Sequence, residues 1–430
     1  MSAVASPSNA SPELSTYCLD LARRARAAAR LLATVGGARK NAWLLRSADA
    51  LERRSAEILA ANEQDLSAAA AMGLSAAQLD RLRLTPARLR DAAEGVREVA
   101  ALPDPVGQIR AGSVRPNGLL VHKVGVPLGV LLFVYESRPN VTVDAAALSV
   151  KSGNAILLRG GREALRSNIA LHRILRDCSI AAELPEDAVQ LVETGDRAAV
   201  GQLLKMNDFI DLVIPRGGES LIRRVAEEAR MPVLKHYKGI CHVFVEKSAD
   251  LDRAERIVLN AKCQRPGVCN AMECLLVEES VASSFLPRVA VGLHRRGVEL
   301  RGCPATRRIL PEAIPATTED FDTEFLDLVL SMKVVANLDE AVAHITRHGS
   351  GHTDAIVTND LSAARRFTAA VDSAAVLVNA STRFHDGQEL GLGAEIGIST
   401  DKFHARGPCG LLELTSYKYI VYGDGHVRGE

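Results

Sequence analysis

The sequence predicts an α/β protein whose parallel β-sheets are covered by helices on both faces. Three observations lead to this fold class. Apolar residues recur at helical spacing through the first hundred residues. From Val130 onward, short β-rich runs alternate with amphipathic segments, and 430 residues are enough for two or three domains. We therefore expect two α/β domains that interleave along the chain.

The first segment is predicted to be helical from its start signal onward. Ser11-Pro12-Glu13 combines a capping serine, a proline suited to the first helical position and an acidic first turn. The stretches "LSTYCLDLARRARAAARLLATV" and "NAWLLRSADALERRSAEILAANEQDL" continue the helical spacing, and "LPDPVG" ends this block with two prolines. Residues 105–126 instead alternate around Pro116-Asn117-Gly118, which predicts a β-hairpin.

The remaining elements follow the strand–helix alternation. The predicted strands are the runs "GVLLFVYE", "NAILLRG", "FIDLVIP", "CHVFVEK", "AMECLLV", "LSMKVVA", "DAIVT" and "AVLVNA". The predicted helices between them include residues 142–152, 163–177, 218–230, 251–262, 338–348 and 360–370.

Composition excludes several classes of protein. The formal net charge is zero, so the chain offers no electrostatic surface for nucleic acid or for anionic membranes. No apolar run reaches the roughly 18 residues of a membrane span. The N-terminal stretch lacks the basic start and apolar core of a signal peptide. We therefore expect a cytoplasmic location, where cysteines stay reduced.

Three of the eight cysteines lie close together in "KCQRPGVCNAMEC". Their C-x5-C-x4-C spacing lacks the paired ligands of zinc sites, so no metal is expected. Cys263 ends a predicted helix, and Cys274 falls inside a predicted strand, where a thiol is usually core. Cys269 alone follows an irregular Arg-Pro-Gly stretch, where positive neighbours favour the reactive thiolate. Cys269 is therefore the candidate nucleophile.

Several long stretches resemble those of the γ-glutamyl phosphate reductases (glutamate-5-semialdehyde dehydrogenases), members of the aldehyde dehydrogenase superfamily, and they occur in the same order along the chain. They are "NAKCQRPGVCNAMECLLV", "VPLGVLLFVYESRPNVTVDAAALSVKSGNAILLRGG", "LKHYKGICHVFV", "GSGHTDAIVT" and "STRFHDGQELGLGAEIGIST". The resemblance covers nearly the whole chain. It implies an aldehyde-dehydrogenase-like fold and the NADPH-dependent reduction of L-glutamyl 5-phosphate to glutamate 5-semialdehyde and phosphate, in proline biosynthesis.

In this family the residue matching Cys269 is the nucleophile, which would expel phosphate and leave a thioester. The oxyanion needs hydrogen-bond donors, for which the backbone N–H of Cys269 is the natural candidate. Related enzymes add an asparagine where this chain has Glu136, so Asn270, Asn140 or Ser137 are the alternatives.

Hydrolytic relatives activate water with a glutamate at the stretch that reads "KHYKG" here, residues 235–239, which contains no carboxylate. The lack of such a base favours reduction of an acyl phosphate over oxidation of an aldehyde. Lys235 and Lys238 are either phosphate contacts or solvated lysines.

The resemblance also implies cofactor contacts. Gly217 and Gly218 would let a helix N-terminus approach phosphate. Arg159 matches a lysine that contacts the adenosine ribose, and an arginine there suits the 2′-phosphate of NADPH. Glu324 matches the glutamate that holds the nicotinamide ribose.

For the amino-acid part of the substrate, Arg138 and Arg265 are candidates to bind the carboxylate. Glu136 is the candidate for the amine, and Asn140 lies in the same segment as Glu136 and Arg138.

The expected NADPH-binding domain comprises residues 1–104 and 127–240, and the expected catalytic domain residues 241–402. Residues 105–126 and 403–424 are expected to form a small β oligomerisation flap, or, for the C-terminal part, an ordinary edge strand. We thus expect a homo-oligomer that acts on a small molecule and has no nucleic-acid or membrane partner.

Two other functions remain open from the sequence. The chain could be an acylating aldehyde dehydrogenase that uses coenzyme A or another acyl phosphate, or a non-catalytic scaffold with the same fold. No kinase domain precedes the reductase-like segment, so we expect a separate glutamate 5-kinase to supply the acyl phosphate. A direct hand-off from that kinase remains open.

Overall fold

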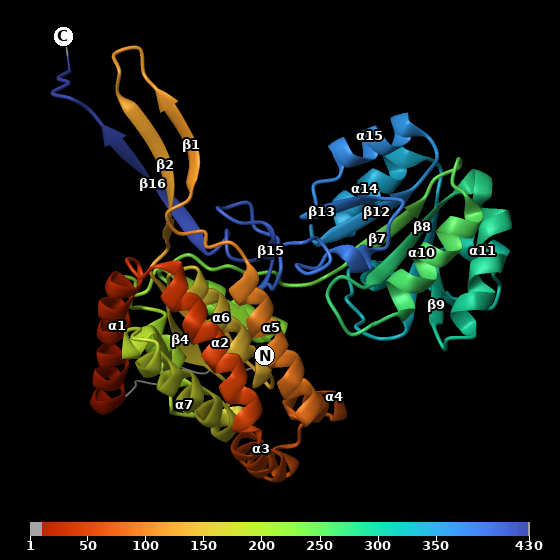
Figure 1. Cartoon of the computed structure of the whole chain (residues 1–430). Helices are drawn as coiled ribbons and strands as arrows, with labels where there is room; N and C mark the ends of the chain where they lie inside the picture. The colour runs from red at the N-terminus through yellow and green to blue at the C-terminus, as the bar shows by residue number, and fades with distance from the viewer. Residues whose placement is uncertain (1–10, 429–430) are drawn as a thin grey trace. The chain divides into compact units, whose positions relative to one another are not determined.

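The computed structural model describes residues 11–428, which form two compact units. Unit 1 holds the chain up to Lys235, Leu392–Gly397 and the chain from Cys409 onward. Unit 2 holds His236–Gly391 and Ile398–Pro408. Figure 1 shows most of unit 1 in red to yellow-green and unit 2 in green to blue. The chain enters each unit more than once, so the two interleave along the sequence.

Unit 1 begins with helices, as the apolar spacing predicts. The Ser11 side chain accepts the N–H of Leu14, and Pro12 takes the first helical position, which confirms the predicted start signal. The helices are α1 (Pro12–Leu32), α2 (Gly37–Arg53), α3 (Ser55–Ala69), α4 (Ala76–Leu82), α5 (Pro86–Ala101), α6 (Asn140–Lys151), α7 (Leu165–Ala181), α8 (Ala198–Leu203) and α9 (Glu219–Glu228), with 3-10 turns η1 (Ala70–Met72), η2 (Arg162–Ala164) and η3 (Glu186–Ala188).

A parallel sheet forms the centre of unit 1. Its spatial order is β5 (Val189–Leu191), β4 (Ala155–Arg159), β3 (Val130–Tyr135) and β6 (Leu212–Arg216). Every residue of β3 and β4 is buried, which is typical of parallel strands covered on both faces. Val130, Leu132 and Val134 pack with residues of α1 and α8, so the residues between them face the other side of the sheet.

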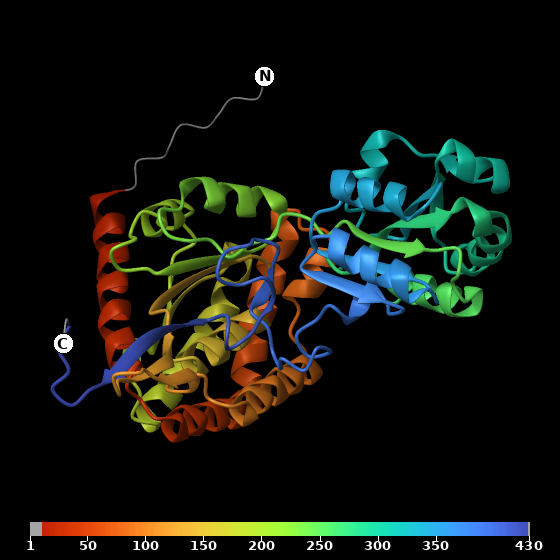
Figure 2. The ribbon, with the colours of Figure 1, turned by 90° about the horizontal axis from the view of Figure 1, so that it is seen from above.

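A second sheet in unit 1 contains the predicted hairpin. Its strands are β1 (Ile109–Val114), β2 (Leu120–Pro127) and β16 (Thr415–Tyr422), all antiparallel. Gly118 has a φ of 92° and donates its N–H to the carbonyl of Arg115, which forms the predicted turn. Figures 1 and 2 show the dark blue β16 beside the orange hairpin, and Figure 1 shows this sheet extending away from the helices of unit 1.

Unit 2 is built on one parallel sheet. Its strands, in spatial order, are β10 (Ile314–Pro315), β9 (Glu299–Gly302), β11 (Val329–Val335), β8 (Met272–Glu278), β7 (Cys241–Val245), β12 (Thr353–Val357) and β13 (Ala375–Val378). The helices are α10 (Leu251–Cys263), α11 (Glu279–His294), α12 (Pro304–Ile309), α13 (Thr318–Phe321), α14 (Leu338–His348) and α15 (Leu361–Ala370), with the 3-10 turn η4 (Thr382–Phe384).

The side chains of this sheet alternate between two hydrophobic clusters. Val243 and Val245 pack with α10 and α11, whereas Phe244 packs with α14 and α15. The helices therefore cover both faces of the unit 2 sheet, as the α/β fold class predicts (Figure 1).

The predicted strands are confirmed as β3, β4, β6, β7, β8, β11, β12 and β13. The sequence pattern missed β5, β9, β10 and the paired strands β14 (Gly397–Ser399) and β15 (Gly407–Cys409). Each of these has two to four residues, too few to show a period. Among the helices within residues 11–428, none has the length and apolar character needed to span a bilayer.

Candidate active site

Cys269 lies on a loop, residues 264–271, between the end of α10 and the start of β8. Its side chain is half-buried, whereas Cys241 and Cys274 are buried. Burial raises the pKa of the thiols of Cys241, Cys263 and Cys274, which favours their protonated form. Cys263 is also half-buried, but it ends α10 and packs against the hydrophobic cluster of the unit 2 sheet. Cys269 is therefore the half-buried thiol of this region that lies on an irregular loop, where a substrate could meet it.

The three neighbouring cysteines separate in the fold. Cys263 packs against the cluster on the α10–α11 face of the sheet, and Cys274 belongs to the cluster on the α14–α15 face. Two groups of His and Cys residues with metal-ligand spacing occur among the described residues, and neither contains more than one of these cysteines. The packing roles predicted for Cys263 and Cys274 are thus confirmed, and the three thiols share no ligand cluster.

The loop lies at the edge of the sheet where β7, β8 and β12 begin. The Cys241 thiol, at the start of β7, donates to the carbonyl of Cys269 at 3.2 Å. Just before β7, Gly239 runs against the backbone of Cys269, and an added Cβ atom there would overlap its carbonyl oxygen. Only a glycine permits this approach, so the segment before β7 fixes the position of the nucleophile loop.

Two histidines flank the thiol. One ring nitrogen each of His236 and His352 and the Sγ atom of Cys269 all lie within 4.8 Å of one another. The Nδ1 atom of His236 lies 2.9 Å from the carbonyl oxygen of Ile398. Because a carbonyl oxygen only accepts, Nδ1 carries the proton, and in the neutral ring Nε2 keeps its lone pair.

A chain of polar contacts continues behind His352. Its Nδ1 atom lies 2.7 Å from the Thr353 hydroxyl, which lies 2.6 Å from Nδ1 of His385. Burial, and then the neighbouring His352, lower the pKa of His385 to about 3, so His385 stays neutral. This series of polar contacts therefore positions the His352 ring from within unit 2.

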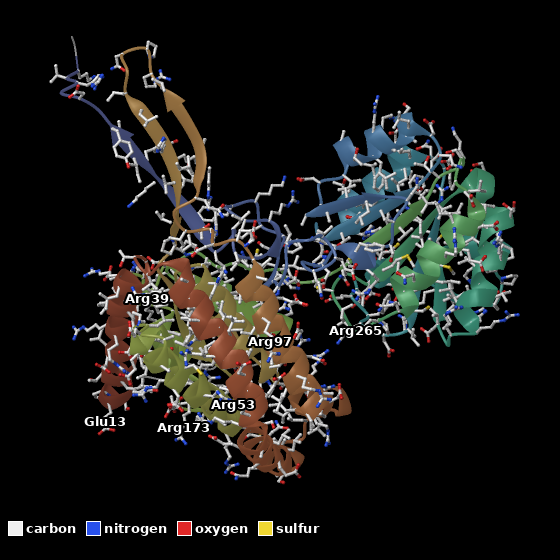
Figure 3. All side chains as sticks on the ribbon, in the orientation of Figure 1. Glu13, Arg39, Arg53, Arg97, Arg173 and Arg265 are labelled. Carbon is white, nitrogen blue, oxygen red and sulfur yellow. The ribbon has the colours of Figure 1, made fainter. Side chains whose placement is uncertain are left out.

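Asn270 is buried and its amide donates to the carbonyl of His385 at 3.0 Å. This donor was a sequence-based candidate for the oxyanion, and in the structure it ties the nucleophile loop to the turn at η4. Arg265 is exposed on the loop, as Figure 3 shows. Arg383 in η4 is half-buried and donates to the Gln264 side chain at 2.8 Å.

Arg383 also lies near the site. Burial and the charge of Arg265 lower its pKa, while Cys269 opposes that change. Two guanidinium groups therefore lie near Cys269, the candidate nucleophile, where anionic groups of a substrate would be attracted.

Below the loop, Lys262 and Glu273 form a buried ion pair, with Nζ 2.6 Å from Oε2. Glu273 also accepts the N–H of Leu326 at 3.2 Å. Burial raises the pKa of Glu273 to about 7, opposed by Lys262 and assisted by Glu324. Glu324, predicted to hold the nicotinamide ribose, is thus half-buried beside this pair. The pair joins α10, β8 and the segment that contains Glu324.

In unit 1, Glu136 follows β3, and Gly217 and Gly218 follow β6. The carboxylate of Glu136 accepts the N–H of Gly218 at 3.0 Å, and an added Cβ at Gly217 would overlap its Oε2 atom. The helix N-terminus predicted to bind a cofactor phosphate is therefore capped by a carboxylate in this structure. A phosphate can take this place only when Glu136 releases the N–H.

Arg159 ends β4 and is buried. Its guanidinium donates to the carbonyls of Gly160 at 3.0 Å and Asp196 at 3.2 Å, and its Nε atom has no partner among the described residues. Burial lowers its pKa, Glu163 opposes this, and the charges of Arg197 and Arg224 lower it further. Several cationic groups thus gather where β4 and β5 end, the edge at which open α/β sheets bind ligands.

Arg138 and Asn140 are half-buried where α6 begins. The amide of Asn140 lies 3.5 Å from the carboxyl of Asp144, whose pKa burial raises to about 7. Ser137, another oxyanion alternative, donates both its N–H and its hydroxyl to Glu163. The predicted site residues therefore fall into two sets: Cys269, Asn270, Arg265 and Glu324 in unit 2, and the others in unit 1.

The sequence analysis assigned no role to His236, His352 and Arg383. Each lies in a stretch that carried the family resemblance, "LKHYKG", "GSGHTDAIVT" or "STRFHDG". The sequence feature that could have identified them is a histidine or an arginine inside a stretch that matches the family. Only the fold shows which of these residues approach the thiol.

Comparisons with known proteins identify the family of this chain. The model of the aldehyde dehydrogenase family matches residues 18–298. A gamma-glutamyl phosphate reductase of Rhodopirellula baltica is 57% identical over 419 residues, which cover 97% of this chain and 96% of that protein. A protein of the same name from Carboxydothermus hydrogenoformans is 55% identical, covering 96% and 99% of the two chains.

A solved structure shows the same similarity in three dimensions. The crystal structure of gamma-glutamyl phosphate reductase from Thermotoga maritima has a TM-score of 0.94 and 46% identity, covering 96% of this chain and 99% of that one. The resemblance inferred from the sequence is confirmed. The chain belongs to the gamma-glutamyl phosphate reductases, within the aldehyde dehydrogenase family.

Proposed function

We propose that this oxidoreductase reduces L-glutamyl 5-phosphate to L-glutamate 5-semialdehyde and phosphate with NADPH, the second step of proline biosynthesis from glutamate. The observation that carries the proposal is the half-buried Cys269, whose backbone lies against Gly239 and whose sulfur lies within 4.8 Å of a ring nitrogen of His236 and of His352. It occurs in a chain that matches named reductases over nearly its whole length.

The first step is carried by Cys269. Its thiolate attacks the acyl carbon, the bond from that carbon to the phosphate oxygen breaks, and a thioester forms. The thiol proton needs an acceptor, and Nε2 of His236 is the candidate because its lone pair is left available by the Nδ1–H bond to Ile398. Arg265 and Arg383 supply positive charge for the substrate's anionic groups.

The oxyanion requires donors that are not already engaged. We retain the backbone N–H of Cys269 as the donor. The sequence analysis offered Asn270 as an alternative oxyanion donor; we now propose it as a positioning residue, because its amide donates to the His385 carbonyl and so holds the loop in place.

The segment that adjoins Cys269 contains no carboxylate, so it offers no carboxylate base to activate water against the thioester. Residues 235–239 carry Lys235, His236 and Lys238 but no carboxylate that could act as a hydrolytic base. Lys238 donates to the carbonyl of Asp322 at 3.4 Å, a contact within unit 2.

A bound nicotinamide cofactor would supply the hydride that converts the thioester to the thiohemiacetal, from which the aldehyde is released. The cationic groups around Arg159, and the unpartnered buried Nε atom, fit a phosphate-bearing cofactor and favour NADPH over NADH. Gly217 and Gly218 fit it once Glu136 releases the N–H of Gly218. Glu324 is proposed to hold the nicotinamide ribose.

The amino-acid end of the substrate needs one acidic and one basic partner. Arg138, with Asn140 beside it, is proposed for the carboxylate, and Glu136 for the amine once its bond to Gly218 is released. The labile acyl phosphate must be made by a glutamate 5-kinase, and a direct hand-off from it would be seen as co-sedimentation of the two proteins.

The reverse reaction tests the proposal. With glutamate semialdehyde, the purified chain should reduce NADP⁺ only when phosphate is present, and Cys269→Ser should abolish the activity while Cys274→Ser retains it. A requirement for coenzyme A in place of phosphate would indicate an acylating aldehyde dehydrogenase. Complete lack of turnover in the folded chain with every acceptor would indicate a scaffold.

A further inference from the structure

The Cys269 thiol also belongs to a set of three metal-ligand atoms. Its Sγ atom and one ring nitrogen each of His236 and His352 lie within 4.8 Å of one another. The three residues come from separate segments: the stretch before β7, the loop before β8 and the residue before β12. We propose that they form a binding site for a divalent cation of the zinc class, which holds the thiol in a reversibly blocked state.

The spacing suits such an ion after small side-chain movements. Zinc binds sulfur at about 2.3 Å and imidazole nitrogen at about 2.0 Å, so ligand atoms of a tetrahedral site lie roughly 3.3–3.6 Å apart. Cys269 and His236 are half-buried on irregular segments, where side-chain rotations that move the ligand atoms by about 1 Å cost little.

The tautomer of His236 supports the proposal independently of the spacing. Because Nδ1 donates to the carbonyl of Ile398, the nitrogen left for a ligand is Nε2 with its lone pair. A backbone carbonyl that holds one ring nitrogen and so orients the other is the usual outer partner of a metal-binding histidine.

The donor set also selects the class of cation. One thiolate and two imidazoles suit zinc and its neighbours, whereas magnesium and calcium require oxygen ligands. The half-buried position of Cys269 leaves a fourth position open to water. The charges of Arg383 and Arg265 oppose a cation here, and the thiolate offsets one of them. We therefore expect moderate rather than very tight affinity.

Binding is a proton exchange without electron transfer. The S–H bond of Cys269 breaks, the proton passes to solvent, and the sulfur forms a bond to the ion. One proton is released per ion bound, and the affinity rises with pH.

A second group in unit 2 provides the matched control. His242, Cys274 and His344 also offer ligand atoms within 4.8 Å, but all three are buried. In this second group, a ring nitrogen of each histidine already contacts another side chain of the unit. Nδ1 of His242 pairs with Asp354 at 2.8 Å, and Nε2 of His344 lies 3.7 Å from the Cys274 sulfur. Lys333 lies 3.5 Å from Nδ1 of His344, so this ring donates through Nε2 and offers no lone pair there.

The first experiment measures binding of Co²⁺ as a spectroscopic substitute for zinc. The chelator-treated full chain should develop a thiolate-to-cobalt charge-transfer band that saturates at one ion per chain. Cys269→Ser should remove the band, His236→Gln should weaken binding at least about tenfold, and Cys274→Ser should leave it unchanged. A band that persists in Cys269→Ser, or that disappears in Cys274→Ser, overturns the proposal.

The second experiment measures the reactivity of the Cys269 thiol directly. Zn²⁺ should slow alkylation of Cys269 by iodoacetamide at least about tenfold, as mapped by mass spectrometry, and EDTA should restore the rate. An unchanged alkylation rate at a saturating Zn²⁺ concentration overturns the proposal. Zn²⁺ should also abolish turnover, and this expectation alone rests on the proposed function. Binding and protection without inhibition would keep the cation site and remove Cys269 from catalysis.

Discussion

A Cβ atom added at Gly239 would lie 2.7 Å from the Cα atom of Cys269 and would overlap the carbonyl oxygen of that residue. Real Cβ atoms do not approach backbone atoms so closely, so a larger side chain must displace the loop. Since the Cys241 thiol donates to the same carbonyl from the start of β7, the strand and the glycine together fix the position of Cys269, the proposed nucleophile.

Gly239→Ala should therefore reduce kcat by about 100-fold, because a displacement of about 1 Å at the reacting atom has that effect. Overpacking should also lower the free energy of unfolding by about 1–3 kcal/mol. Turnover and urea denaturation measure the two effects. Gly267→Ala is the matched control, because its added Cβ would meet only the carbonyl of Leu326, at 3.7 Å. Equal losses in both variants would contradict this role of Gly239.

The double variant Cys263→Ala/Cys274→Ala should remain folded and keep its turnover within about twofold. Both side chains pack against the hydrophobic clusters of unit 2, so each loss should cost about 1 kcal/mol of unfolding free energy. Steady-state kinetics and thermal unfolding test this expectation. A folded double variant without turnover would show that these thiols take part in the chemistry.

His344 should make the protein sensitive to acid. Burial, and then the charges of His242 and Lys333, lower its pKa from 6.5 to about 2. The unfolded chain therefore binds a proton that the folded chain resists, and stability falls as pH decreases from 6.5 towards 2. His344→Gln should reduce the slope of unfolding free energy against pH by up to about 1.4 kcal/mol per unit.

Urea denaturation at several pH values in this window provides the measurement. His294→Gln, at an exposed histidine in the last turn of α11, is the control and should keep the wild-type slope. If the His344 variant and the wild type have the same slope, the ring does not resist protonation in the folded state.

The sheet of β1, β2 and β16 should mediate self-association, as predicted for the flap. Alternation places Tyr417, Tyr419 and Val421 on one face of β16, with exposed fractions of 44%, 64% and 52%. A row of exposed apolar side chains on an edge strand is typical of an interface. Tyr419→Glu should therefore lower the mass measured by analytical ultracentrifugation.

Leu361→Glu is the control for this experiment, because Leu361 is also 64% exposed but begins α15 in unit 2. It should leave the mass unchanged. A wild-type chain that sediments as a monomer, or a Tyr419 variant with unchanged mass, would contradict the role of the flap.

Much of the fold was accessible from local patterns. The capping signal at Ser11 and the turn at Gly118 act within a few residues, so the sequence alone specifies them. The continuous apolar runs of β3 and β8 likewise show burial on both faces without knowledge of their partners. Strands such as β10, with two residues, depend on the neighbour they pair with and could not be predicted.

The sequence by itself determined the α/β class, the family and the choice of Cys269 over Cys263 and Cys274, because these depend on periodicity and on long matching stretches. Only the tertiary structure brought His236 and His352 to the thiol, although 33 and 83 residues separate them from it along the chain. The physical reason is the parallel sheet: β7, β8 and β12 begin at one edge, and the segments that precede them therefore meet there.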